Sequence, residues 1–167
     1  MLEFKPPWRD ASGYVDVRLN EALYEADLAI KFLEQGLHRN AAGKAFQAWK
    51  AVLAAAAALN RDLVAKRYPG TVKDRVGVIR SRVDMVIALM PTVRMREVAG
   101  ILMDKYGWEV LYLTDLALSI HEFQYNGLDP GGIVSKYVNV HDAERDVRHL
   151  AEKAIEWAKR LGEAKSN

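Results

Sequence analysis

The segment that most constrains the fold is an alanine-rich run from Ala45 to Leu59. Alanine has the highest intrinsic helix propensity, so this run predicts a helix. The helix is apolar on most of its faces, and such a helix is stable only where other elements cover it. We therefore predict an all-α fold, a single-domain bundle of five or six helices around a central helix at residues 41–61.

The composition agrees with one globular domain. The chain has 167 residues, of which 50% are apolar and 28% are charged, enough for one substantial core. It contains no cysteine, which excludes disulfides and thiolate zinc sites and suits an intracellular protein from a hot environment. The N-terminus lacks a secretory signal, and the uncharged helical run at residues 51–60 is too short to cross a bilayer. We expect a cytoplasmic protein without a membrane partner.

Proline, glycine and the spacing of apolar residues divide the rest of the chain. Pro6 and Pro7 forbid a helix there, so we predict an extended arm over residues 1–13 that either lies loose or straps across the body through Phe4 and Trp8. No convincing β-alternation is longer than residues 13–17. The predicted domain covers residues 14–163, followed by a tail at 164–167, and further helices are expected at 15–37, 72–89, 91–105, 108–125 and from Asp142 onward.

Two predicted helices carry polar stripes. Asp115, Ser119, Glu122 and Asn126 share one stripe, with His121 and Tyr125 beside it, and Asn40, Lys44 and Gln47 share a face of the central helix. If these faces met, they would form a cluster of a cation, amides, a phenol and an imidazole, suited to an anionic or nucleotide-like ligand. The alternative is that they are solvated surface or a hydrogen-bonded contact between helices.

The first functional hypothesis is therefore a non-catalytic module that binds such a ligand or a partner protein. Lys44 and Lys136 would neutralise the charge of the ligand, Gln47 and Asn126 would orient it, and Tyr125 would offer a stacking face. The full set of predicted ligand-binding residues is Lys44, Gln47, His121, Tyr125, Asn126, Lys136 and Tyr137, with Lys136 and Tyr137 as lids from the following loop.

No catalytic or metal-binding motif is found. No two histidines stand four residues apart, and Asp146 with His149 is interpreted as a solvated pair on an amphipathic helix, so no metal and no cofactor are predicted. Ser119 and His121 would point about 160° apart on one helix, which excludes a triad. Gly43-Lys44 lacks the spacing, the preceding strand and the hydroxyl residue of a phosphate-binding loop.

The segment from Arg61 to Arg82 is basic, with seven Lys and Arg against two Asp. Such a segment could bind nucleic acid through the phosphates. Tyr68 is its one aromatic residue, so no base-stacking platform accompanies the charge. The alternative interpretation is a solvated connection between helices.

Three segments resemble the archaeal PaREP family (type one), a large group of uncharacterised proteins from hyperthermophiles. They are Asn40–Lys50, Pro91–Met95, and His121–Gly127 with its continuation to Tyr137. That family is similar in fold to the higher eukaryote and prokaryote nucleotide-binding (HEPN-like) domains, which are helical bundles that often dimerise. The resemblance therefore implies a bundle and a homodimer.

The resemblance also suggests a second hypothesis, because some of those domains are RNA-cleaving toxins that use an Arg followed by His after four to six intervening residues. No histidine here has an arginine at that distance. A toxin-type enzyme would have to use His121 as general acid or base, with Glu122 orienting it. The third hypothesis is a purely structural, homo-oligomerising protein.

Overall fold

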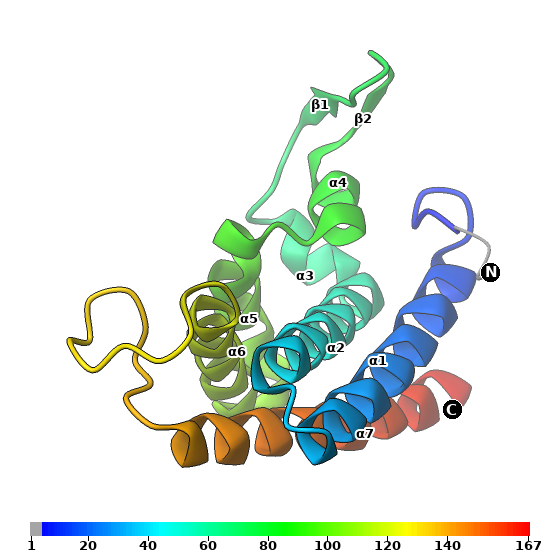
Figure 1. Ribbon diagram of the computed structural model, residues 1–167. Coiled ribbons are helices and arrows are strands. Elements are labelled where there is room, and N and C mark those ends of the chain that lie inside the picture. Colours follow the sequence, from blue (N-terminus) through cyan, green and yellow to red (C-terminus); the bar gives the residue numbers. More distant parts are fainter. Residues whose placement is uncertain (1–4) are drawn as a thin grey trace.

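The computed structural model describes residues 5–167, which form seven helices and one antiparallel hairpin (Figure 1). The chain is mostly helical, which confirms the predicted all-α class. Within residues 5–167, no helix combines the length and the hydropathy of a membrane span. The elements are α1 (Ala11–Glu34), α2 (His38–Leu59), α3 (Arg61–Ala65), β1 (Thr71–Lys73), β2 (Ile79–Ser81), α4 (Arg82–Leu89), α5 (Thr92–Tyr106), α6 (Glu109–Asn126) and α7 (Val140–Ser166).

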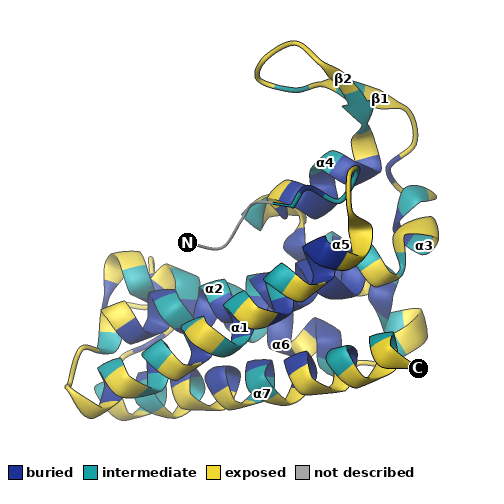
Figure 2. Cartoon of the chain, turned by 90° about the vertical axis from the view of Figure 1, so that its right-hand side faces the viewer, coloured by how far each residue is buried: buried dark blue, intermediate teal, exposed yellow. Residues whose placement is uncertain are grey.

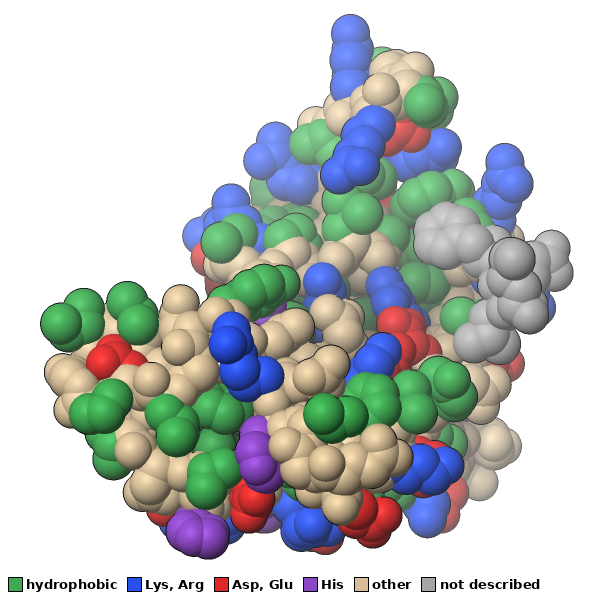
Figure 3. Space-filling view, in the orientation of Figure 1, with side chains coloured by type: hydrophobic (Ala, Val, Ile, Leu, Met, Phe, Trp, Pro, Cys, Tyr) green, Lys and Arg blue, Asp and Glu red, His purple; other side chains and the backbone are tan. Residues whose placement is uncertain are grey.

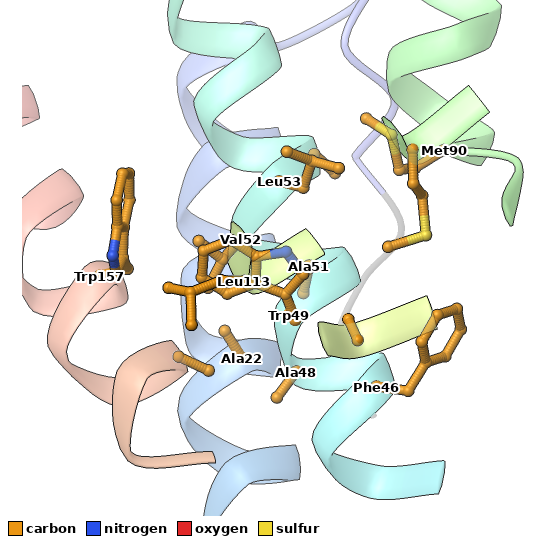
Figure 4. Close-up of a cluster of buried hydrophobic side chains, with 14 of the residues drawn as sticks. Ala22, Phe46, Ala48, Trp49, Ala51, Val52, Leu53, Met90, Leu113 and Trp157 are labelled. Atoms are coloured by element: carbon orange, nitrogen blue, oxygen red, sulfur yellow. The ribbon is translucent and has the colours of Figure 1, made fainter. Parts of the chain in front are cut away.

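The packing of α2 depends on its small side chains. This helix contacts α1, α4, α5, α6 and α7, and every alanine from Ala41 to Ala57 is fully buried. Ala22 of α1 and Ala48 of α2 lie in the same core cluster (Figure 4). Because these side chains are single methyl groups, neighbouring backbones approach α2 closely on several sides. Figure 2 shows the buried residues along the inward faces of the helices and the mostly exposed hairpin.

Two buried tryptophans connect α2 with α6 and α7. The Trp49 indole N–H donates a hydrogen bond to Thr114 Oγ1 at 2.9 Å, and the Thr114 hydroxyl donates to the Val110 carbonyl at 2.7 Å. Trp157 of α7 meets Trp49 edge to face, with the ring centroids 5.7 Å apart. The polar atom of Trp49 is thus satisfied where α2 packs on α6, whereas Trp157 Nε1 is buried without a hydrogen-bond partner among residues 5–167.

The predicted helix at residues 72–89 is wrong in its first half, which is the β1–β2 hairpin. Asp74 closes the turn, because its carboxylate accepts hydrogen bonds from the backbone N–H groups of Val76 at 3.0 Å and Val78 at 2.9 Å. Gly77 has a positive φ of 83°, which suits glycine. The apolar residues at 72, 76, 79 and 83 match helical spacing, but the local turn chemistry of Asp74 and Gly77 prevails.

Several helix boundaries also differ from the predictions. Asp10 caps α1 by accepting a hydrogen bond from the Gly13 N–H at 2.8 Å, so residues 11–13 are helical instead of part of the arm. Asn139 caps α7 by accepting from the Asp142 N–H at 2.9 Å, which starts this helix before Asp142. Phe4, one of the two predicted strap residues, lies outside the described residues.

The close packing around α2 yields a stability prediction. Ala26 of α1 is fully buried, so Ala26→Leu should force neighbouring helices apart and lower the free energy of unfolding by about 1–3 kcal/mol. Urea denaturation measures this change, with Ala164→Leu at an exposed position of α7 as the control that should have little effect. Equal stability of the Ala26 variant and the wild type would contradict the packing described above.

Candidate functional site

The outer side of α2 carries a short polar stripe. Of residues 41–57, only Lys44, Gln47 and Lys50 are not buried. They recur every third residue, so they lie along one stripe of the helix. Residues of α1 and α6 face this stripe from its two sides. We call the group the α2 seam, and it consists of Glu21 and Glu25 of α1, Lys44, Gln47 and Lys50 of α2, and His121 and Gln124 of α6.

On the α1 side, each carboxylate of the seam already has a cation. Lys44 Nζ lies 2.9 Å from Glu25 Oε2, and Arg18 pairs with Glu21 at 2.8 Å. Arg18 also donates hydrogen bonds to the Tyr14 hydroxyl at 3.0 Å and to a backbone carbonyl of α4 at 2.8 Å. The charge of Lys44 is therefore compensated within the protein.

Lys50 differs from Lys44. It is half-buried and forms no ion pair with any residue in the described part of the chain. Burial lowers the pKa of Lys50, and the positive charge of Arg18 lowers it further, while Glu21 acts in the opposite direction. Lys50 is thus the uncompensated cation of the seam. Lys50 was not among the predicted ligand-binding residues, although it continues the stripe of Lys44 and Gln47 by one step of three residues.

On the α6 side, an imidazole and an amide lie against the first turns of α2. The His121 ring stacks on Phe46 with centroids 4.0 Å apart and meets the Tyr125 ring edge to face at 5.1 Å. Gly43 lies directly against Gln124, since a Cβ atom added to Gly43 would stand 2.7 Å from Gln124 Nε2. The absence of a side chain at Gly43 is what allows this approach.

Unpaired polar atoms concentrate in the seam. His121 Nδ1 and Gln124 Oε1 are buried without a hydrogen-bond partner among residues 5–167, whereas Glu25 Oε2 lies 2.9 Å from Lys44 Nζ. Elsewhere in that range, Trp157 Nε1 shares this property, while His38 Nδ1 lies 3.2 Å from Glu144 Oε1. Buried polar atoms in proteins are almost always hydrogen-bonded, so two such atoms lying against one helix indicate a place with unused hydrogen-bonding capacity.

The seam lies next to a hollow at the start of α2. Arg39, Asn40 and Gln124 line this hollow, which is open to solvent and has a volume of about 360 Å³. The Arg39 guanidinium donates hydrogen bonds to the carbonyls of Gln124, at 2.9 Å, and of Tyr125. These bonds hold the end of α6 beside α2, so Gln124 borders both the hollow and the seam.

The other predicted ligand-binding residues lie apart from the seam. Lys136 Nζ donates to Ser119 Oγ at 2.9 Å, and Ser119 is about 160° around α6 from His121. Tyr137 is buried, and its hydroxyl donates to Asp146 Oδ2 at 2.8 Å. Lys136 and Tyr137 therefore do not cover His121. The side-chain amide of Asn126 stabilises the loop after α6, because it donates a hydrogen bond to the Val134 carbonyl at 2.9 Å.

Three buried tyrosines yield a prediction for alkaline pH. Burial raises the pKa values of Tyr14 and Tyr137, and burial with a hydrogen bond to Glu97 raises the pKa of Tyr68 to about 12. A raised pKa means that the folded state holds the proton more tightly than the unfolded state does. This stabilisation is complete below the unfolded pKa of about 10 and is lost as the pH rises through the folded pKa.

The free energy of unfolding should therefore fall above pH 10, by at most about 1.4 kcal/mol per pH unit for each such tyrosine. Urea denaturation between pH 8 and 12 measures the slope. In Tyr137→Phe the slope should be smaller, because one titrating group is removed. The same slope in Tyr137→Phe and wild type would contradict the role of Tyr137.

Comparison with known proteins identifies a family. The sequence model of the archaeal PaREP1/PaREP8 family matches residues 17–148, which include most of α1, the whole of α2 and α6, and all three of the resembling segments. This match confirms the family resemblance. No curated protein and no solved structure shows significant similarity to the chain.

Proposed function

We propose that this chain, which belongs to the archaeal PaREP1/PaREP8 family, binds a small anionic ligand with a planar group in the α2 seam. One observation carries the proposal. The only residues of α2 between Ala41 and Ala57 that escape burial are polar, and they lie beside two unpaired buried polar atoms of α6, His121 Nδ1 and Gln124 Oε1. An ordinary helix contact would be apolar or fully hydrogen-bonded at these positions.

The contacts suggest a role for each residue. Lys50 neutralises the charge of the ligand, because its own charge has no carboxylate partner among the described residues, whereas Glu25 already compensates Lys44. Gln47 and Gln124 supply hydrogen bonds that orient the ligand. Tyr125 is 66% exposed and offers a ring face beside His121 for a planar group. A nucleotide has both the charge and the ring.

A thermal-shift assay with inorganic phosphate, AMP and ATP tests the proposal. A nucleotide at 100 times its Kd should stabilise the protein by about 2.7 kcal/mol, which is a Tm rise of about 5–10 °C for a chain of this size. Phosphate alone should give a smaller rise, because it lacks the planar group. If none of the three compounds raises the Tm, the proposal is wrong.

Lys50→Met separates binding from folding. The variant should keep or slightly increase the Tm without ligand, because it removes a half-buried cation whose burial is unfavourable. It should lose the shift caused by a nucleotide. The control is Lys31→Met, since Lys31 lies on the exposed surface of α1 and pairs with Asp27 at 2.6 Å; this variant should bind as the wild type does. Wild-type binding by Lys50→Met would remove Lys50 from the site.

Two other hypotheses have separate tests. RNA cleavage with His121 as general acid or base predicts degradation of mixed RNA by the pure protein and its loss in His121→Ala; that result would replace the binding proposal. Glu122, the residue expected to orient His121, is exposed. The homodimer implied by the family resemblance stays a prediction, which light scattering after gel filtration tests.

A further inference from the structure

The positive charge of the chain is concentrated around the hairpin. Residues 61–97 contain nine Lys and Arg against four Asp and Glu, whereas the whole chain has 24 against 22. The rest of the chain is therefore net negative. Figure 1 shows the hairpin projecting away from the helices, and Figure 3 shows Lys and Arg side chains around it with few acidic ones.

Most acidic residues of this region form ion pairs with arginines of the same region. Asp74 pairs with Arg80 at 2.8 Å, Asp84 with Arg61 at 2.7 Å, and Glu97 with Arg67 at 3.0 Å. The remaining cations are exposed and form no ion pair with any residue between 5 and 167; they are Lys66, Lys73, Arg75 and Arg82. These four cations are available to an anionic partner.

The hairpin is held in a definite position. Val72 is paired with Arg80 in the sheet register, and the Arg80 guanidinium lies 4.2 Å from the centroid of the Trp8 ring. This face of the hairpin therefore rests on the N-terminal arm. The next pair, Lys73 and Ile79, lies on the opposite face, because successive side chains of a strand alternate. That face presents an exposed cation beside an exposed aliphatic side chain.

We propose that the β1–β2 hairpin is a binding arm for double-stranded DNA, which it contacts through phosphates without reading the base sequence. A two-stranded ribbon fits the major groove of B-form DNA, which is about 12 Å wide. The major groove of A-form RNA is too deep and narrow. Tyr68 is the one aromatic residue of residues 61–97 and is buried, so these residues expose no aromatic ring for stacking single-stranded bases.

Other anionic partners fit the hairpin less well. Val76 and Ile79 are 83% and 65% exposed, but Ile79 is paired with Lys73, so a lipid layer that accepted Ile79 would also have to accept a cation. Aromatic side chains usually anchor a protein at a membrane interface, and the one aromatic side chain of residues 61–97, Tyr68, is buried. A second copy of the chain would bring the same positive charge, and repulsion disfavours pairing of the two hairpins.

Fluorescence anisotropy with a labelled 20-base-pair duplex of mixed sequence, between 50 and 200 mM salt, tests the proposal. The affinity should not depend on the base sequence. The plot of log K against log salt should have a slope of about −2.7 if Lys73, Arg75 and Arg82 neutralise three phosphates. In the double variant Lys73→Glu/Arg75→Glu, the affinity should fall at least tenfold and the slope should approach about −0.9.

The matched control is Arg148→Glu/Lys159→Glu, which makes the same change in net charge. Both residues are exposed on α7, at the opposite end of the molecule from the hairpin (Figure 1). This variant should bind DNA nearly as the wild type does. Circular dichroism and the Tm of each variant establish that it is folded, and Arg82→Gln provides a milder second variant outside the hairpin strands.

Four results would overturn the proposal. They are no binding of the duplex at 50 mM salt, equal losses in the hairpin and control variants, tighter binding of single-stranded RNA than of duplex DNA, and binding of phosphatidylserine vesicles without binding of DNA. None of these variants changes a residue of the α2 seam. The nucleotide shift and the DNA binding can therefore fail independently.

Discussion

The constraint on which the structure depends is the burial of α2 on nearly all sides. Burying one alanine side chain contributes little stabilisation, because only a single methyl group is removed from water. The α2 helix is therefore stable only because several helices cover it at close range. Each of those helices must present a face that fits single methyl groups, and α1 does so with Ala22, Ala26 and Ala29, all fully buried. The other helices leave α2 partly exposed along one stripe, and the side chains of that stripe are longer and polar.

A comparison along α6 shows why the seam is unusual. Near the start of α6, Thr114 accepts from the Trp49 indole and donates to a backbone carbonyl, so its polar atom is fully used. Two turns later on the same helix, His121 and Gln124 also face α2, yet each has a buried atom without a partner among the described residues. The contact between α2 and α6 is thus fully hydrogen-bonded around Thr114 and not around His121 and Gln124. The part around Gln124 is also the part that borders the hollow.

The parts of the fold that could be predicted from sequence are those with strong periodicity or propensity. The helices around Ala45–Leu59 and over residues 108–125 correspond closely to α2 and α6. The hairpin was missed because residues 72, 76, 79 and 83 satisfy helical spacing, and only the hydrogen bonds of Asp74 decide against it. Its turn signal, Asp74 three residues before Gly77, was present in the sequence.

The site was predictable only in part, for a different reason. Lys44, Gln47 and His121 follow from helical stripes, and Lys50 could have been added by the same rule. Glu25 and Gln124 could not, because their part in the seam depends on which helices pack beside α2. The positions of Lys136 and Tyr137 depend on the path of the loop after α6, and that path is set by hydrogen bonds to Ser119 and Asp146, which helical periodicity does not specify.

One residue connects the seam with the hairpin. Arg18 pairs with Glu21 beside Lys50 and donates to the Ala88 carbonyl of α4, and α4 follows β2 directly. Tyr14 strengthens the same link, because its hydroxyl donates to the Ile87 carbonyl at 2.6 Å. A substitution at Arg18 would thus leave Glu21 without its cation and loosen the base of the hairpin at once. Substitutions at Lys50 and Lys73 therefore distinguish the two surfaces, because neither residue forms an ion pair within residues 5–167, whereas a substitution at Arg18 affects both.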